Sequence, residues 1–377
     1  MIDFTNSRIM FIATTDNMIW QFLIPHIKDL ESYGARVDCF CAKTGFWFDE
    51  LREKYKLNMI QIPFERSPFK LKNLKAYKML KKYQIENVYN LIYCQQPVGG
   101  MMGRLIGKKF HIPVIYTAHG FFFFKNNNAL KNLIFKTAEK YLSKYTNVLL
   151  TMSSEDFQAI EDWNVKYKYK INGIGFDNSK YDLARFDKMK FKQEFYIEEN
   201  NKVIVTVAEF IKRKNYPAMI KCFAKVKKLY PNVKYIVCGV GKLQNKMKSL
   251  VCRLHLEDSV IFAGYRKDIN KILQISDLML LLSKQEGLTM AIMEAMFYSL
   301  PVVTSNVRGN RDLIDDSLGG KLVNYKNIDE VASSILEILN NEDMIQKMGE
   351  YNHKKVENYD IGVVRGQLKK IYEEVEF

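Results

Sequence analysis

The 377-residue sequence has few of the residues that build metal sites and disulfide frameworks. It has five histidines and six cysteines, with no C-x-x-C pair and no D-x-D triplet. Cysteines without such spacing favour reduced core thiols over a zinc site or a disulfide scaffold. The missing acidic triplet argues against a carboxylate-bound divalent metal. We therefore expect a site that works without a metal ion.

Long apolar runs are also absent. No run reaches the roughly 18 to 20 residues that a membrane-spanning helix needs, and the N-terminus lacks the basic-then-apolar order of a signal peptide. Repeats of 20 to 50 residues and low-complexity tracts are missing too. The expectation is a cytosolic globular protein, and its length favours two domains of roughly 150 residues or more each.

Positive charge is in excess and is uneven. The net charge is +15, and residues 1–170 hold 25 Lys and Arg against 15 Asp and Glu. Such a field attracts nucleic acid, anionic lipid head groups or phosphorylated small molecules. A nucleic-acid-binding protein is one hypothesis, but the charge extends over both halves and no nucleic-acid-binding module is recognisable, so we expect no nucleic-acid partner.

Apolar strands alternate with helical patterns along most of the chain. This order predicts α/β domains with parallel, doubly wound sheets. The polar, basic stretch 179–201 predicts a connector between a first and a second series of strands. The predicted strands are 8–15, 36–42, 58–63, 90–94, 113–117, 148–152, 202–208, 235–238, 260–264, 277–283 and 300–305.

Two glutamates, Glu286 and Glu294, lie between the last two of these strands. The intervening loop should open at the carboxyl edge of the sheet, where α/β proteins bind ligands. If the helix begins near Leu288, the N–H groups of Gly287, Leu288 and Thr289 would face an anion, most simply a phosphate. The alternative is a pair of surface glutamates on an amphipathic helix.

Two further groups follow predicted strands. His119 comes just past a strand end and beside a glycine, a position typical of a ligand cleft. The phenylalanines at 121–124 could seal the cleft, cover a lipid-linked acceptor or simply pack. Three cations, Lys212, Arg213 and Lys214, follow the first strand of the second series, and they predict a diphosphate clamp.

Two basic helices are predicted in the first half. The lysine-rich pattern at 66–83 favours either a solvated helix face or a patch for a membrane surface or anionic acceptor. The second helix, 130–145, carries an apolar stripe that predicts contacts with the core. Glycines 99, 100 and 103 open another helix, either to bind an anion or to allow close helix packing. The stripe consists of Leu130, Leu133, Ile134, Tyr141, Leu142 and Tyr145.

The E-x7-E spacing of Glu286 and Glu294 resembles the signature of family 4 glycosyltransferases, which have the GT-B architecture. Further motifs are similar to those of the family, and some to its capsule and exopolysaccharide branch: R-S-P-F at 66–69, P-V-G-G at 97–100, Y-T-A-H-G-F at 116–121 and N-G-I-G-F-D at 172–177. The resemblance implies two Rossmann-like domains facing a central cleft. Residues 1–175 would form the acceptor-side domain, residues 176–357 the nucleotide-sugar domain, and a helix at about 358–377 would cross back to the first.

The resemblance also implies an activity. A retaining, metal-independent transferase of hexosyl or N-acetylhexosaminyl type would move a sugar from a nucleotide diphosphate sugar, UDP-linked, to a hydroxyl of a growing glycan. The donor is a substrate, and no cofactor is implied. The acceptor would be a polyprenyl-diphosphate-linked capsular or exopolysaccharide glycan, with the basic first domain on the inner membrane surface. A nucleotide-sugar epimerase of the same fold is the alternative, although it should offer more cleft histidines and carboxylates than His119 and Glu286.

Site roles follow from the same resemblance. Glu294 would hold the ribose hydroxyls and Glu286 those of the donor sugar. Lys214, partnered by Arg213 or Lys212, would stabilise the departing diphosphate. His119 would orient the sugar. Many family members have an arginine where this chain has Glu209, which leaves the partner of Lys214 open between those two cations. The nucleotide base would contact the backbone of Tyr265 and Arg266.

Overall fold

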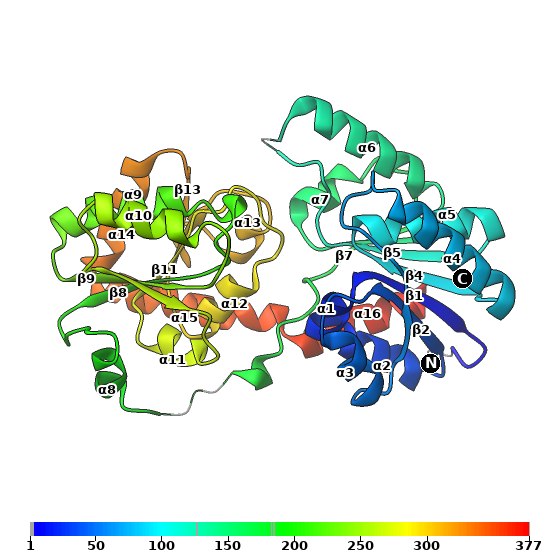
Figure 1. The fold of residues 1–377 in the computed structure, drawn as a ribbon, viewed down its shortest axis with the longest axis horizontal. Helices are drawn as coiled ribbons and strands as arrows, with labels where there is room; N and C mark the ends of the chain where they lie inside the picture. The colour runs from blue at the N-terminus through cyan, green and yellow to red at the C-terminus, as the bar shows by residue number, and fades with distance from the viewer. Residues whose placement is uncertain (1–3, 126, 182, 184, 377) are drawn as a thin grey trace. The chain divides into compact units, whose positions relative to one another are not determined.

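A computed structural model describes residues 4–125, 127–181, 183 and 185–376. The chain forms two compact units, unit 1 with Met1–Gly175 and Ile361–Phe377, and unit 2 with Phe176–Asp360 (Figure 1). The sequence predicted the first boundary between 175 and 176 and the return of the chain at about 358. The returning segment begins at Ile361.

Within the described residues, unit 1 is a parallel seven-stranded sheet in the order β3-β2-β1-β4-β5-β6-β7. Its strands are β1 Arg8–Thr15, β2 Arg36–Ala42, β3 Asn58–Gln61, β4 Leu91–Gln95, β5 Val114–Ala118, β6 Val148–Thr151 and β7 Tyr167–Lys170. Its helices are α1 Asp16–Met18, the π-helical turn η1 Ile19–Leu23, α2 Ile24–Ser32, α3 Trp47–Glu53, α4 Lys72–Asn87, α5 Pro97–Phe110, α6 Ala129–Ser143, α7 Ser154–Ala159 and α16 Ile361–Glu374.

Unit 2, again within the described residues, has a parallel six-stranded sheet in the order β10-β9-β8-β11-β12-β13. Its strands are β8 Lys202–Val207, β9 Val233–Cys238, β10 Val260–Gly264, β11 Leu278–Leu281, β12 Val302–Ser305 and β13 Gly320–Val323. Its helices are η2 Asn178–Lys180, α8 Lys188–Gln193, η3 Lys212–Lys214, α9 Tyr216–Leu229, α10 Gln244–Arg253, α11 Ile269–Gln274, α12 Met290–Phe297, α13 Asn310–Leu313, α14 Ile328–Leu339, α15 Glu342–Val356 and η4 Glu357–Tyr359.

Both sheets reverse their strand order beside their first strand, so each has a switch point, at β1/β4 in unit 1 and at β8/β11 in unit 2. The central strands are buried along their length, as expected for a sheet covered by helices on both faces. The predicted pair of doubly wound α/β sheets is confirmed. Two short strands, β7 and β13, were not predicted because their sequences, YKYK and GKLV, lack a long apolar run.

Gly100 and Gly103 of α5 allow close packing against the sheet, which supports the packing interpretation of this segment. A Cβ on Gly100 would lie 2.2 Å from the Tyr116 ring, and one on Gly103 would lie 2.8 Å from Cys94 Cβ. Phe121 and Phe123 are buried and stacked at 4.7 Å, so packing accounts for two of the four consecutive phenylalanines.

Five of the six cysteines are buried, whereas Cys252 is exposed. All six are free thiols, in keeping with the expectation of reduced cysteines. In the described part of the chain, no helix has both the length and the apolar character to cross a membrane.

The sequence predicted that the apolar stripe of α6 contacts the core, and this prediction is wrong for most of the stripe. Leu130 and Leu133 are each 65% exposed, and Ile134 and Tyr141 are about half exposed. Of the six stripe residues, Leu142 is buried and Tyr145 is partly buried. The face of α6 that packs inward carries Glu139 and Ser143 instead, so the apolar stripe points to solvent.

Candidate active site

The loops that follow β8 and β11 meet at the switch point of unit 2. The two strands are parallel neighbours, and therefore their carboxyl ends lie at the same edge of the sheet. The first loop passes through η3, which contains Arg213 and Lys214, and the second contains Glu286. A backbone hydrogen bond of 2.8 Å from Lys284 N to Arg213 O ties the loops together.

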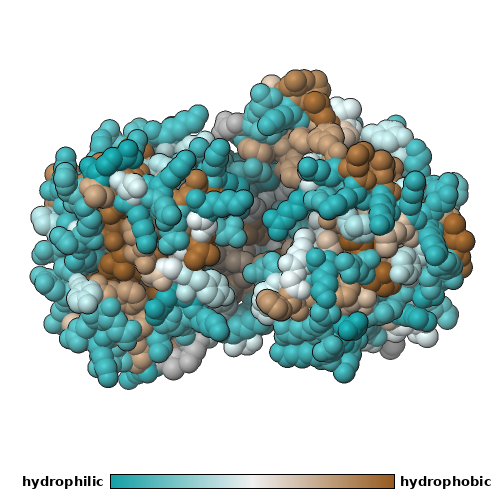
Figure 2. Space-filling model, in the orientation of Figure 1, coloured by the Kyte–Doolittle hydropathy of each residue, from teal (hydrophilic) through white to brown (hydrophobic). Residues whose placement is uncertain are grey.

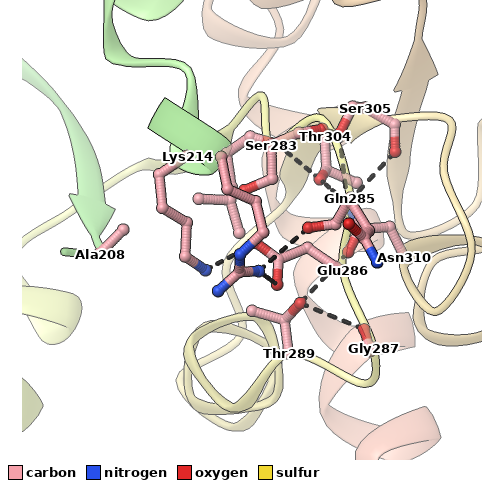
Figure 3. A network of polar contacts seen from close by, with 12 residues as sticks. Ala208, Lys214, Ser283, Gln285, Glu286, Gly287, Thr289, Thr304, Ser305 and Asn310 are labelled. Carbon is pink, nitrogen blue, oxygen red and sulfur yellow. Dashed lines mark hydrogen bonds and ion pairs between the residues drawn. The ribbon is translucent and has the colours of Figure 1, made fainter. Parts of the chain in front are cut away.

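Glu286 is held by two cations (Figure 3). Lys214 Nζ donates to one carboxylate oxygen of Glu286, and Arg213 Nη1 donates to the other, each at 2.6 Å. Arg213 Nη1 also donates to Gln285 O at 3.0 Å. The structure thus brings three predicted site residues together. Arg213 makes the second ion pair with Glu286, while Lys212 is exposed.

The burial of this cluster is unequal. Glu286 is 5% exposed and Lys214 is 9% exposed, whereas the Arg213 side chain is 42% exposed. Removing one partner of a buried ion pair leaves an uncompensated charge, which is strongly destabilising. Arg213 can therefore exchange partners with little desolvation, whereas Lys214 needs an anionic partner, here the Glu286 carboxylate, to offset its burial.

Asn310, the first residue of α13, holds this loop against the end of β12. Its Nδ2 donates to Thr304 Oγ1 at 2.8 Å and to Ser305 O at 3.2 Å, and its Oδ1 accepts from Thr289 Oγ1 at 3.3 Å. The side chain is fully buried, and Figure 3 shows it within the polar network of this loop. Sequence reasoning missed this residue; its place just after a predicted strand end was the available signal.

A close backbone contact fixes the loop that contains Gly287. Gly309 has φ of +79°, and a Cβ there would lie 2.0 Å from Gly287 O. Helix α12 begins at Met290, slightly later than predicted, so the N–H groups of Gly287, Leu288 and Thr289 precede its first turn. Within the described residues these three N–H groups donate no hydrogen bond, and donors of this kind at a helix start suit an anion.

Glu294, on α12, has a different partner from Glu286. It accepts a hydrogen bond of 2.8 Å from Tyr181 Oη, in the first segment of unit 2. Burial raises the pKa of Glu294, and the Tyr181 hydroxyl partly offsets this effect. Nothing in the connector's pattern marked Tyr181, whose ring stacks on Phe176 at 4.7 Å.

The two residues predicted to contact the base follow β10, at the edge of the unit 2 sheet. Tyr265 is 74% exposed. Arg266 forms a paired interaction with Asp268, through Nε at 2.7 Å and Nη2 at 2.5 Å. The Arg266 side chain is thus paired with Asp268, and the Tyr265 side chain is exposed to solvent.

His119 belongs to unit 1, just past the end of β5. Its Nε2 lies 2.7 Å from Gln95 Oε1, at the end of the neighbouring strand β4. Burial lowers the pKa of His119 to about 3, so the imidazole is neutral at pH 7. With Nε2–H donating to the Gln95 carbonyl, Nδ1 is the acceptor. Gln95 was not predicted, although two neighbouring strand ends were a usable signal.

Asp16 lies at the switch point of unit 1, directly after β1. It is fully buried, and its carboxylate accepts from the N–H groups of Asn17 and Thr44 and from the Thr44 hydroxyl. This carboxylate is thus committed to fixing two loops. Beside it, Thr14 N donates to Gln96 Oε1 at 3.2 Å.

Comparisons with known proteins show which family this chain resembles. Residues 8–153 match the family model described as glycosyl transferase 4-like, and residues 187–355 match the model of glycosyl transferases group 1. EpsD of Bacillus subtilis strain 168, described as a glycosyltransferase, is 28% identical over 92% of this chain and 91% of its own. An Escherichia coli UDP-Gal:alpha-D-GlcNAc-diphosphoundecaprenol alpha-1,3-galactosyltransferase is 26% identical over 89% and 88% of the two chains.

Solved structures show the same fold. Anabaena HepE in complex with UDP and glucose superposes with a TM-score of 0.80 at 19% identity, covering 98% of this chain and 100% of that one. The two family models together span both strand series, and the fold is that of the GT-B enzymes. The chain belongs to glycosyltransferase family 4, and its activity is the transfer of a sugar from a nucleotide sugar.

Proposed function

We propose that this protein is a retaining, metal-independent transferase that uses a UDP-sugar and extends a polyprenyl-diphosphate-linked capsular or exopolysaccharide glycan. The observation that carries the proposal is the cluster of Lys214, Arg213 and Glu286 beside the N–H groups of Gly287 to Thr289. It combines a cationic clamp, a carboxylate and a helix start at one switch point, as a nucleotide diphosphate sugar requires.

Each residue has a role matched to its surroundings. Lys214, buried and fixed, together with the more exposed Arg213, would stabilise the diphosphate as it leaves. Glu286 holds both cations in the structure and would accept hydroxyl hydrogen bonds of the sugar when phosphate oxygens replace it at the cations. Glu294 would accept the ribose hydroxyls, and neutral His119 would orient the sugar through Nδ1.

The reaction needs no enzymic nucleophile in this scheme. The bond between the sugar's anomeric carbon and the diphosphate oxygen breaks while a bond to the acceptor oxygen forms on the same face. The acceptor's hydroxyl proton passes to the leaving diphosphate. The contribution of the chain is then electrostatic, because the cations and N–H groups stabilise charge that develops on the leaving group.

The lipid-linked acceptor rests on likeness and on charge. The Escherichia coli relative acts on a sugar linked to diphosphoundecaprenol, and residues 1–170 are the more basic part of this chain. Lys75, Lys78, Lys81 and Lys82 lie on or beside the outward face of α4. We propose that these lysines attract the first unit to an anionic inner membrane surface.

The donor hypothesis is tested by following nucleotide release. The protein is incubated with a panel of UDP- and GDP-sugars, with and without membrane extract, and released nucleoside diphosphate is measured. We expect UDP release that increases with extract, and an unchanged anomeric configuration in the product. The proposal is overturned if no nucleoside diphosphate appears, or if the sugar is epimerised without transfer.

Membrane attraction by α4 is tested separately. Changing Lys75, Lys78, Lys81 and Lys82 to Glu should strongly reduce co-sedimentation with anionic vesicles at low salt, because each cation near the surface contributes about 1 kcal/mol. Unchanged partitioning would contradict this part of the proposal while leaving the donor chemistry intact.

A further inference from the structure

One face of helix α6 packs against unit 1, and the opposite face is exposed to solvent. Residues advance by about 100° per position in an α-helix, so Asn132, Phe135, Glu139, Leu142 and Ser143 share one side. These five residues are buried or partly buried. The first ten residues of the helix are otherwise exposed, which means that α6 attaches to unit 1 through one face and extends its other face into solvent.

The outward face is apolar. Leu130, Leu133, Ile134 and Tyr141 lie roughly 180° from the packed face and are 65%, 65%, 50% and 47% exposed. Phe122, 37% exposed, borders the helix through its contact with Phe135 at 5.2 Å. Hydrophobic atoms are visible over α6 in Figure 2. The stripe from Leu130 to Tyr141 is about 16 Å long. It is therefore a continuous apolar surface and not a set of isolated exposed apolar residues.

Lysines flank this stripe on both sides. Lys131 lies about 60° from Ile134 on one side, and Lys136 lies about 60° from Leu133 on the other. Both lysines are exposed. An apolar stripe with a lysine on each side is the pattern of a helix that lies in a membrane interface, with its lysine ammonium groups reaching the lipid phosphates.

A basic hollow continues the stripe at the C-terminal end of α6. It is lined by Lys108, His111, Lys144 and Lys166, together with Tyr145 and Asn147. Lys108 Nζ lies 2.9 Å from Tyr141 Oη and over the Tyr145 ring at 4.5 Å. Tyrosines with one polar end and one apolar face are enriched at membrane interfaces, so this region matches lipid head groups next to the apolar stripe.

A buried ion pair fixes the helix in this orientation. Arg104 of α5 is fully buried, and its Nη1 lies 2.8 Å from Glu139 Oε2 on the inward face of α6. The Arg104 guanidinium also lies 4.1 Å from the Tyr116 ring centroid. Rotating α6 to bury its leucines would break this pair and leave a buried charge, which is costly. The apolar stripe therefore stays outward before any partner binds.

We propose that the outward face of α6 is a docking surface for an anionic lipid bilayer, with Leu130, Leu133 and Ile134 entering the interface and Lys131 and Lys136 contacting phosphates. The surface is separate from the lysines of α4, which lie across α5 on the same helical layer of unit 1 (Figure 1). The inference does not depend on the donor chemistry, because vesicle binding is measured without any nucleotide sugar.

The experiment compares two pairs of exposed leucines. Wild type, Leu130→Ser/Leu133→Ser and the control Leu229→Ser/Leu318→Ser are sedimented with vesicles of equal phosphatidylglycerol and phosphatidylcholine, or of phosphatidylcholine alone. The control leucines are 72% and 55% exposed in unit 2. We expect wild type and control to bind the anionic vesicles, and the α6 variant to bind at least about tenfold more weakly at both low and high salt.

Two further measurements keep the proposal falsifiable. In Ile134→Trp, tryptophan emission should shift to shorter wavelength on addition of anionic vesicles and not of neutral ones. Sedimentation velocity reports the oligomeric state. The proposal is overturned if wild type does not bind anionic vesicles, if the α6 variant binds as wild type does, or if wild type is a dimer that the α6 substitutions dissociate, since the stripe would then serve a second copy of the chain.

Discussion

The switch points of the two units share a strand order and differ in chemistry. In unit 2, the loops after β8 and β11 bring two cations to one carboxylate, and three N–H groups stand beside them. In unit 1, the carboxylate of Asp16 already accepts hydrogen bonds from backbone and hydroxyl donors. His119, near that edge, is neutral and bonded to Gln95.

This difference shows that the strand order of a doubly wound sheet fixes where a site lies, whereas the loops fix the chemistry of the site. The strand order places both sites at carboxyl edges. Of the described residues at these two switch points, the side chains after β8 and β11 form an ion-paired cluster, in which the proposed diphosphate would replace Glu286 as the partner of the cations. We therefore expect charge changes in unit 2 to act on chemistry, and changes at His119 to act on orientation and on stability at low pH.

The largest effect should follow Lys214→Ala. Loss of the buried ammonium removes stabilisation of the leaving diphosphate, and kcat/KM should fall by about 10² to 10³. The neighbouring exposed cation provides the control, since Lys212→Ala should stay within about threefold of wild type. The measurement is UDP release under steady-state conditions. Equal losses of kcat/KM in both variants would show that the effect depends on positive charge near the site and not on the Lys214 ammonium itself.

The next largest effect should be that of Gly309→Ala, which should lower the free energy of unfolding. Its Cβ would lie 2.0 Å from Gly287 O, and φ is +79°, so collision adds to backbone strain. We expect a loss of about 2 to 4 kcal/mol in the free energy of unfolding, with reduced activity. Gly264→Ala is the matched control, because Gly264 has φ of +69° with nothing within 4 Å of an added Cβ. It should cost about 1 kcal/mol. Similar losses would mean that the contact with Gly287 is unimportant.

Glu294→Ala should weaken UDP binding by about tenfold, since two hydroxyl hydrogen bonds to a carboxylate are lost. Titration calorimetry measures the Kd. Tyr181→Phe removes the donor to Glu294 and leaves the carboxylate in place, so its Kd should stay within about twofold of wild type. An unchanged Kd in Glu294→Ala would exclude the ribose assignment.

The smallest effect concerns pH. His119 takes up a proton at about pH 3 in the folded chain, against 6.5 ordinarily. Its contribution to stability is therefore complete above pH 6.5 and is lost as pH falls toward 3. At pH 5, relative to pH 7.5, His119→Gln should lose about 1 to 2 kcal/mol less unfolding free energy than wild type. Urea titrations test this, with the exposed His255→Gln as control. Parallel losses in all three proteins would contradict it.

Strand ends were the most predictable part of the site. Long buried runs located β8 and β11, and the residues after them included Lys214 and Glu286. Their direct ion pair was not predicted, because resemblance assigned the lysine to phosphate and the glutamate to the sugar. Tyr181 escaped because its contact with Glu294 joins segments far apart in the chain, a property that no local pattern contains. Asn310 escaped because the sequence after β12 does not indicate which of its polar side chains turns inward.

The prediction of which face of α6 packs against the core failed for a different reason. Periodicity locates an apolar stripe but does not say which side of the helix meets the core. Here the inward side is stabilised by Glu139, whose charge is compensated by the buried Arg104 of α5. Such a pair depends on tertiary neighbours, and the usual rule that leucines turn inward then gives the wrong face.

The last helix has a consequence for the order of folding. Helix α16 follows all of unit 2 in sequence, yet Val364, Leu368, Ile371 and Tyr372 are buried in unit 1. On the ribosome, where domains generally fold from the N-terminus, unit 2 has its entire core before unit 1 does. The first unit thus remains unfinished until α16 has been synthesised, because Tyr372 of that helix contacts Tyr93 in the core of unit 1.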